Sequence, residues 1–519
     1  MPMHPDDSQA IQWRHDAPAS VVVFLVALPL CLGVALASGA PLFAGIIAGV
    51  VGGLVVAPLS GSALMVSGPA AGLTAIVLSA ITQLGDYRAF LVAVVLGGLL
   101  QLGLAALRAG IIGYYFPSAV IKGMLAAIGL VLILKRFPHA VGYDADAMGD
   151  EAFAQANAEN TFSGIAHALG SIEPGAVLIA LLSLAILFAW PSTPLARVRL
   201  LPAPLAVVVL GIVANLAFAT VAPGLVLEAT HLVALPVPQS AAAWGQQFAF
   251  PAWHLLTDPA VWRIAVTLGI VASLETLLSL EATDKMDPYK REAPPNRELF
   301  AQGIGNMLSG LIGGLPVTGV IVRSAANVGA GARTRWSAIL HGLLLLVAVV
   351  AIPRVLNLIP LAALAAILLH TGYKLAHPSI LRAMIRLGRS QWVPYVVTVL
   401  AILLTDLLVG IAVGMSVGVF IILRDTLRNP PFTVVSPKGA VLTRWQLHDQ
   451  VHFLNKAALL DALESLAPGS RVEVDGRMVR RFDADALEVL HSFADTAQLR
   501  SIDYRLVSIP SRPQGAAAH

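Results

Sequence analysis

The chain has 519 residues, of which 57% are hydrophobic and only 12% are charged. An average soluble domain carries about 25% charged residues, so this chain could not cover a globular surface of its size with solvated groups. The composition indicates a membrane protein and argues against an enzyme. A net charge of +3 is too small to indicate a nucleic-acid partner by itself. The single cysteine, Cys31, excludes a disulfide framework and a Cys-x-x-Cys metal site.

Apolar segments follow one another from residue 17 to about residue 425. One helical membrane crossing takes about 20 residues, and on that basis we predict about fourteen spans, several of them shorter than a full crossing. The predicted spans are 17–37, 41–58, 68–84, 88–107, 114–134, 174–191, 200–219, 260–281, 297–313, 319–330, 336–353, 357–376, 392–408 and 409–425. We therefore predict a short N-terminal segment at 1–16 and an all-α transmembrane domain at 17–428.

Lysine and arginine are distributed unevenly over the connecting loops. If the N-terminus is cytoplasmic, the basic loops 285–297 and 374–389 lie inside, and the long loops 138–173 and 220–259, which carry acidic residues, lie outside. Cytoplasmic loops of membrane proteins carry such an excess of positive charge. An even number of spans returns the C-terminus to the cytoplasm. We predict an integral protein of the cell (inner) membrane. We expect no nucleic-acid partner, because the distribution of positive charges is explained by the orientation of the chain in the membrane.

The composition changes near residue 430, where charged residues become frequent. Alternating apolar residues predict strands, and apolar residues at helical spacing predict helices. The predicted elements are strands 451–454, 471–474 and 504–507 and helices 456–466 and 483–494. They predict a small α/β domain at 429–510, followed by a Pro/Gly/Ala-rich tail at 511–519 that we expect to be disordered.

Two segments of the membrane part are interrupted in the same way. They are 61–77 and 314–329, and each has a short extended stretch, then Gly or Pro among small residues, then a piece too short to span alone. Such interrupted segments in corresponding positions of two halves indicate the binding site of a transporter. The similar offsets of the two breaks within the halves favour an inverted repeat of seven plus seven spans. The alternative is a pair of ordinary kinked helices.

A helix that starts inside the membrane directs unpaired N–H groups and its positive end into the cavity there. Two such ends facing each other would form an anion site. Pro69 and Thr318 suit positions beside helix starts, because proline loses no hydrogen bond in a first turn and threonine can cap. Arg323 lies about one turn into the second half-helix. It either binds an anion directly or pairs with Glu275, and the sequence leaves both open.

Charged residues inside a membrane are costly and therefore indicate function. Glu275 lies in the middle of a predicted span, and Ser279 follows four residues later on the same helical face. A carboxylate with a hydroxyl can bind a hard cation such as Na⁺ through oxygen atoms, or the carboxylate can take up a proton. The alternative is a structural glutamate neutralised by a basic neighbour. Lys122 lies near a membrane boundary, and we expect it to extend toward the interface.

Several stretches resemble the SulP family of inorganic anion transporters, the sulfate permease family. The resemblance covers nearly the whole chain, and it is most specific in its second half and C-terminal part. The stretches that carry it are WRHDAPASVVVFLVALPLCLGVALASGAP, MVSGPAAGLTA, SLETLLSLEATDKMD, NRELFAQGIGNMLSGLIGGLPVTGVIVRSAANVGAGART and FLNKAALLDALESLAPGSRVEVDGRMVRRFDADALEVL. The last of these resembles the family's cytoplasmic STAS domain.

The resemblance implies a seven-plus-seven inverted repeat divided into core and gate domains, and a homodimer. It implies an anion held between the starts of spans 3 and 10. The substrate-binding residues would be Ser67, Gly68, Pro69, Ala70, Ala71, Thr318, Gly319, Val320, Arg323 and Ser324. The coupling-ion residues would be Glu275, Ser279 and Thr318, with Glu275 and Ser279 as candidate Na⁺ ligands.

Two features depart from the family pattern. Leu30 and Cys31 follow Pro29 where many sulfate-transporting members have a glutamine, which weakens the case for plain sulfate uptake. Residues 483–486 lack the serine that regulated STAS domains phosphorylate. Other stretches, such as LKRFPHAVGYD, resemble bicarbonate-transporting members. That branch suggests carbonic anhydrase as a partner of the STAS domain.

The sequence therefore predicts a secondary active transporter of bicarbonate or sulfate that works by alternating access, is coupled to Na⁺ or H⁺, and uses no cofactor. One alternative is an anion channel or exchanger without cation coupling. Another is a permease of the same fold for an organic acid or nucleobase, although the small apolar residues Ala70, Ala71, Gly319 and Val320 favour a compact ion. A third is a membrane-anchored sensor whose output is the STAS domain.

Overall fold

The computed structural model describes residues 12–69, 71–145, 153, 159–194, 201–238, 240–428, 430–435 and 442–511. The predicted N-terminal segment up to residue 11, the site residue Ala70 and the tail from residue 512 lie outside these ranges. The chain divides into two compact units, Met1–Met415 and Ser416–His519.

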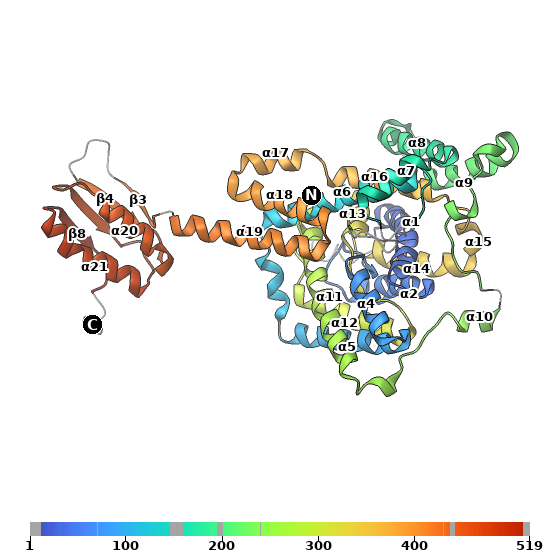
Figure 1. Ribbon diagram of the computed structural model, residues 1–519, viewed down its shortest axis with the longest axis horizontal. Coiled ribbons are helices and arrows are strands. Elements are labelled where there is room, and N and C mark those ends of the chain that lie inside the picture. Colours follow the sequence, from blue (N-terminus) through green and yellow to red (C-terminus); the bar gives the residue numbers. More distant parts are fainter. Residues whose placement is uncertain are drawn as a thin grey trace. The chain divides into compact units, whose positions relative to one another are not determined.

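The first unit is built almost wholly of helices (Figure 1). In its first half the helices are α1 (Trp13–Ala37), α2 (Leu42–Val51), which continues through a wider turn at Gly52–Val56 into α3 (Ala57–Leu59), α4 (Thr74–Leu84), α5 (Tyr87–Ala106), α6 (Ser118–Ala140), α7 (Thr161–Gly170), α8 (Pro174–Ala189), α9 (Ala203–Val221) and α10 (Ala241–Gly245). In its second half they are α11 (Pro259–Met286), α12 (Pro295–Ile312), α13 (Ile321–Gly329), α14 (Trp336–Ala351), α15 (Pro353–Leu356), α16 (Leu361–Leu375), α17 (Ser379–Arg386), α18 (Arg389–Leu404) and α19 (Leu407–Arg428), the last of which runs on into the second unit.

Every predicted span coincides with a helix in this order. Within the described residues, eight helices are long and apolar enough to cross a membrane, and three shorter apolar helices are α4, α14 and α18. The protein is thus a polytopic helical membrane protein. The count of fourteen crossings and the inverted repeat stay predictions.

Small residues bring the membrane helices close together. A Cβ atom added to Gly45 would lie 1.9 Å from the carbonyl oxygen of Cys31, so α1 and α2 touch through their backbones. A Cβ atom on Gly53 would lie 2.5 Å from the Cα atom of Gly342. Close backbone approach through glycine is the usual way in which membrane helices gain packing energy. It explains why a chain so poor in aromatic residues forms a dense core.

The helices form two groups, and each half of the unit contributes to both. In the first group, α1 packs on α2, α13 and α14, and α5 packs on α11 and α12. In the second group, α6 packs on α16 and α18, and α8 packs on α9 and α16. Figure 1 shows α1 and α2 of the N-terminal half beside α14 of the other half. Helices far apart in the sequence therefore enclose the centre of the unit together.

The second unit contains a four-stranded sheet in the order β3-β4-β6-β8. Strands β4, β6 and β8 are parallel, and β3 is antiparallel to β4. The elements are β3 (Phe432–Val434), β4 (Leu442–Leu447), β5 (Gln450–Val451), α20 (Lys456–Glu464), β6 (Arg471–Asp475), β7 (Arg481–Phe482), α21 (Ala484–Leu499) and β8 (Asp503–Val507). The predicted α/β character is confirmed, together with both helices and the strands at 471–474 and 504–507.

The predicted strand at 451–454 is wrong in its position. The chain is extended only at Gln450–Val451 and then forms a helical turn at Phe453–Asn455. The amide oxygen of Asn455 accepts a hydrogen bond from the backbone N–H of His452 at 3.0 Å, and such a side-chain cap competes with a strand. The central strand is instead β4, whose Trp445 stacks on Phe432 with ring centroids 4.0 Å apart.

Candidate functional site

The two interrupted segments meet as a short antiparallel strand pair inside the first unit. Strand β1 (Ser67–Pro69) pairs with β2 (Val317–Gly319), and Gly68 lies opposite Thr318. The backbone N–H of Val320 donates to the carbonyl oxygen of Val66 at 2.9 Å and continues the pairing. Non-helical backbone at membrane depth is tolerated only where protein or a cavity surrounds it. All six strand residues are buried, which satisfies that condition.

A helix starts directly beyond each of these strands. After β1, a single helical turn at Ala71–Leu73 leads into α4, and after β2, α13 starts at Ile321. Among the described residues, no side chain caps the start of α4 or of α13. The first amide groups of a helix have no partner within that helix, and they carry a partial positive charge. Two uncapped helix starts therefore lie within a few residues of one strand pair.

The side chain of Arg323 extends from α13 to the first strand and is completely buried, with 0% of its surface exposed. Its Nη2 donates to the carbonyl oxygen of Pro69 at 3.4 Å. Its Nε and Nη1 have no hydrogen-bond acceptor among the described residues. A Cβ atom on Gly68 would lie 2.1 Å from Nη1, so glycine at this position makes room for the guanidinium.

Within the described ranges, the guanidinium of Arg323 contacts the carbonyl oxygen of Pro69. Its polar neighbours include the thiol of Cys31 on α1 and the imidazole of His341 on α14. Neither side chain brings a negative charge to balance the guanidinium. A buried cation without a balancing partner is costly, and this cost is the strongest indication of an anion at this place.

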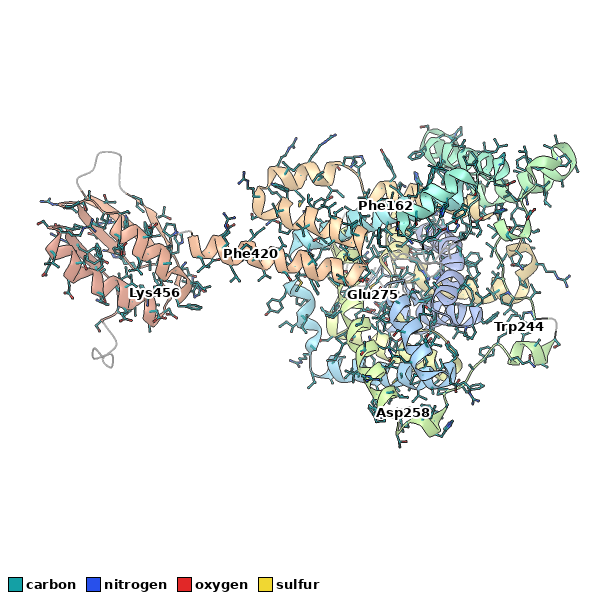
Figure 2. All side chains as sticks on the ribbon, in the orientation of Figure 1. Phe162, Trp244, Asp258, Glu275, Phe420 and Lys456 are labelled. Carbon is teal, nitrogen blue, oxygen red and sulfur yellow. The ribbon has the colours of Figure 1, made fainter. Side chains whose placement is uncertain are left out.

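Glu275 and Ser279 lie on α11, and each contacts one of the two interrupted segments. Glu275, which Figure 2 shows deep among the helices, is 5% exposed. Its Oε1 is 2.8 Å from the place that a Cβ atom on Gly72 would occupy, so the carboxylate lies against the turn that leads into α4. The Cβ atom of Ser279 is 3.2 Å from a Cβ atom built on Gly319. The two side chains thus connect α11 with both interrupted segments.

Three other predicted site residues form hydrogen bonds around the strand pair through their hydroxyl groups. Ser67 Oγ accepts from Gln302 Nε2 at 2.7 Å. Ser324 Oγ donates to the carbonyl oxygen of Val320 at 2.8 Å and accepts from the backbone N–H of Val66 at 3.0 Å. Thr318 is completely buried, and its Oγ1 lies 3.3 Å from the carbonyl oxygen of Gly319.

A column of polar side chains on α12, behind the strands, was missed by the sequence reasoning. Asn306 Nδ2 donates to Val317 O at 2.9 Å and to Gln101 Oε1 at 2.7 Å, and Asn306 Oδ1 accepts from Val317 N at 2.6 Å. Ser309 Oγ donates to Leu315 O at 2.6 Å. The signal in the sequence was the spacing of four between Glu298, Gln302 and Asn306, which places them on one helical face.

The profile of the sulfate permease family matches residues 13–398. The chain belongs to the sulfate permease family. It is 26% identical over 378 residues to the bicarbonate transporter BicA of Picosynechococcus sp.. That alignment covers 71% of this chain and 63% of BicA, so it spans less than two thirds of that relative.

Solved structures share the fold of this sulfate permease family member. The transmembrane domain of a cyanobacterial bicarbonate transporter BicA matches with a TM-score of 0.54 and 22% identity, over 80% of this chain and 99% of that domain. Murine Slc26a9, an anion transporter in the inward-facing state, matches with a TM-score of 0.64 and 16% identity, over 96% of this chain and 85% of its own. At these identities, the likeness establishes the fold.

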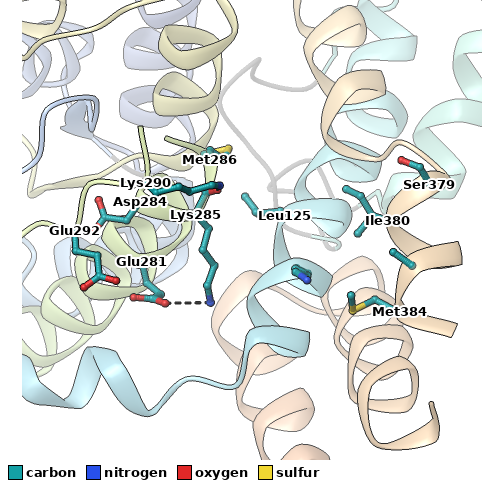
Figure 3. A pocket seen from close by; sticks show the side chains of 12 residues that line it. Leu125, Glu281, Asp284, Lys285, Met286, Lys290, Glu292, Ser379, Ile380 and Met384 are labelled. Atoms are coloured by element: carbon teal, nitrogen blue, oxygen red, sulfur yellow. Dashed lines mark hydrogen bonds and ion pairs between the residues drawn. The ribbon is translucent and has the colours of Figure 1, made fainter. Parts of the chain in front are cut away.

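This family member also has a charged cavity of about 710 Å³ beside the site helix. Figure 3 shows the end of α11 on one side of it and Ser379, Ile380 and Met384 of α17 on the other. Its charged lining residues are Lys122, Lys285, Lys290, Glu281, Asp284 and Glu292. Lys285 Nζ is 3.0 Å from Glu281 Oε1, so these two charges balance each other. Lys122 on α6 also lines this cavity, and its expected extension toward the membrane interface stays a prediction.

Proposed function

We propose that the protein is a secondary active transporter of bicarbonate or sulfate. The anion would lie between the starts of α4 and α13, bound by the unpaired N–H groups there. The observation that carries this proposal is Arg323, which is buried, has two nitrogens without an acceptor, and lies against the strand pair. Membership of the sulfate permease family and similarity to BicA support these two anions as candidates.

A compact inorganic anion suits this arrangement better than an organic substrate does. Gly68, Gly319 and Val320, which lie beside the helix starts, have no polar side-chain group. The ligand would therefore be recognised by charge and by backbone N–H groups. A nucleobase or a dicarboxylate would need several polar side chains to match its edges. This favours the anion over the related permease functions.

The coupling cation would bind on the other side of the strand pair, at α11. Glu275 supplies a buried carboxylate, and Ser279 and Thr318 supply hydroxyl oxygens near Gly319. Oxygen ligands of this kind suit Na⁺. A cation there would offset part of the anion's charge. The carboxylate of Glu275 would equally serve a proton, and the coupling experiment below distinguishes the two.

We further propose that the two helix groups are the core and gate of an alternating-access transporter. The group of α1, α5 and α11–α14 would carry the site, and the group of α6, α8, α9, α16 and α18 would form the gate. The lysine-bearing cavity between α11 and α17 would then be the cytoplasmic vestibule. Its lysines would raise the local anion concentration near the site.

The finer architecture is part of the same proposal. It comprises fourteen spans arranged as a seven-plus-seven inverted repeat. The protein would lie in the inner membrane with both termini in the cytoplasm, and it would form a homodimer. The second unit would be a STAS domain, and its partner could be carbonic anhydrase. The positive loops at 285–297 and 374–389 support this orientation.

Uptake of labelled bicarbonate and sulfate into proteoliposomes tests the function. We expect one of them to accumulate against its gradient when an inward Na⁺ or proton gradient is imposed. If neither anion enters under any gradient, the proposal is wrong. Currents that are linear in voltage and ignore both gradients would identify a channel instead. Transport by a chain ending at Arg428 would exclude a sensor role in which the second unit is the output.

Glu275→Gln is expected to lower gradient-driven uptake at least about tenfold, because the neutral amide no longer supplies the charge that a coupling cation needs. The measurement is initial uptake at fixed anion concentration, with Na⁺ and pH varied separately. Glu281→Gln is the matched control, since Glu281 lies on the same helix but is partly exposed and paired with Lys285. An unchanged cation dependence in the Glu275 variant would refute the coupling role.

A further inference from the structure

The polar column on α12 contains a second buried carboxylic acid, which the proposed function does not use. Glu298 lies in the first turn of α12 and is completely buried, with 0% of its surface exposed. Its Oε1 accepts from Gln302 Nε2 at 3.0 Å, and its Oε2 is in short contact with the hydroxyl of Ser60. The backbone amide of Gly61 is the third group beside it. All three neighbours are neutral.

The charged groups around Glu298 do not pair with it. Arg297 on its own helix donates to the carbonyl oxygen of Leu59 at 2.9 Å. Arg335, just before α14, donates to the carbonyl oxygens of Pro58 and Ser60, each at 3.2 Å. Asp284 on α11 also faces it, and its own carboxylate accepts from the backbone N–H of Ala293. Among the described residues, Arg297 and Arg335 therefore act on Glu298 through their charge, while their own hydrogen bonds go to these carbonyl groups.

These contacts suit a carboxyl group that changes its protonation state. An ionised carboxylate buried this completely is stable only when it is paired or well hydrogen-bonded. The protonated form fits the same neighbours, with Oε2–H donating to Ser60 Oγ and Oε1 still accepting from Gln302. Glu298 lies in the first turn of a helix, where the partial positive charge of the helix end lowers the free-energy cost of the ionised carboxylate. Both states are therefore accommodated without rearranging the surrounding helices.

The same hydrogen bonds connect Glu298 with the anion site. Gln302 Nε2 contacts Glu298 Oε1 at 3.0 Å and Ser67 Oγ at 2.7 Å. Ser67 belongs to β1, which pairs with β2 beside the two helix starts. A charge on Glu298 thus lies two hydrogen bonds from the strand that would hold the anion. At that range inside a protein, like charges repel appreciably.

We propose that Glu298 is a proton-exchanging group linked to anion binding. A proton taken up from solution forms an O–H bond with Oε2, and the negative charge near the anion site disappears. Protonation therefore strengthens anion binding, and by reciprocity anion binding draws a proton onto Glu298. This inference rests on the proposed function. In it, Glu298 on α12 exchanges the proton that is linked to anion binding, and Glu275 binds the coupling cation. Glu298 acts through Gln302 and Ser67 and does not touch the anion.

The test uses the purified full-length protein in lipid nanodiscs. An infrared titration should show a carboxylic-acid carbonyl band that disappears as the pH rises, and Glu298→Gln should remove that band. Asp16→Asn is the matched control. Asp16 is also completely buried on this helix group, but it accepts from Gln12 N, Arg333 N and Thr334 N and Oγ1, which hold it in a structural role. The band should survive in the Asp16 variant.

Anion affinity measured against pH in the same nanodiscs is the second readout. In the native protein, affinity should rise roughly tenfold as the pH falls through the titration of the band. In Glu298→Gln it should stay at the high value at every pH. A band that persists in Glu298→Gln, or an unchanged pH slope of affinity, would overturn the proposal.

Two further outcomes keep the inference separate from the proposed function. If no inorganic anion binds to any variant, the transport proposal fails, while the infrared band still decides whether Glu298 exchanges a proton. If Glu298→Gln does not fold, Ser60→Ala takes its place. Loss of the Ser60 hydroxyl should move the carbonyl band to higher frequency, and an unmoved band would contradict the assignment.

Discussion

Arg323→Ala protein is expected to bind its anion at least about thirtyfold more weakly than the native protein, with transport falling in proportion. Removing one member of a buried, hydrogen-bonded charge pair costs about 2–5 kcal/mol, and every 1.4 kcal/mol is a tenfold change in affinity. The reason is specific to this site, because the two nitrogens of Arg323 without an acceptor lie beside the helix starts. Equilibrium anion binding to the detergent-purified protein measures the effect directly.

Arg323→Lys is the control for this prediction. It keeps the positive charge but loses the planar guanidinium that occupies the space beside Gly68. We expect partial binding, between that of the native protein and that of the alanine variant. Thermal stability should fall little in either variant, since replacing Arg323 leaves no carboxylate without its partner among the described residues. Native affinity in the alanine variant would show that Arg323 has only a packing role.

Asn306→Ala is expected to lower the free energy of unfolding by about 2–4 kcal/mol. Three hydrogen bonds worth about 1 kcal/mol each are lost, and the backbone N–H and C=O of Val317 lose these partners while buried. Since Val317 belongs to β2, the strand pair itself should loosen and transport should fall as well. A thermal unfolding scan and an uptake assay on the same preparation measure the two consequences.

Asn327→Ala serves as the comparison. Asn327 is equally buried, on α13, but it makes a single hydrogen bond, from Nδ2 to the carbonyl oxygen of Leu64 at 2.9 Å. Its loss should cost about 1 kcal/mol. Equal destabilisation by the two variants would mean that the hydrogen bonds of Asn306 to β2 stabilise the fold no more than one ordinary buried amide does.

Much of the architecture was predictable because it depends on local properties of the chain. Helices were expected in fourteen segments, and a helix lies in each of them. The short interrupted segments were visible as Gly and Pro among small residues, and they are the segments that form β1 and β2. The spacing of Glu275 and Ser279 predicted one helical face, and both side chains lie against the interrupted segments, Glu275 at Gly72 and Ser279 at Gly319.

The misses have physical causes that spacing does not reveal. The strand expected at 451–454 failed because a side-chain cap at Asn455 turned the chain, and the true strand β4 carries its apolar residues earlier. The column on α12 was missed because a spacing of four shows only that its polar residues share one helical face. Its role depends on which backbone groups face it, and those belong to strands elsewhere in the sequence.

The sequence by itself determined that this is a helical membrane protein of the sulfate permease type, with two interrupted segments and a small α/β unit. These properties follow from hydrophobicity, helix length and backbone flexibility, which each segment carries alone. Only the tertiary structure decided that Gly68 lies opposite Thr318, that Arg323 fills the space beside Gly68, and that Glu298 connects with Ser67 through Gln302. Contacts between residues more than two hundred positions apart depend on how all the helices pack together. No local pattern in the chain encodes that packing.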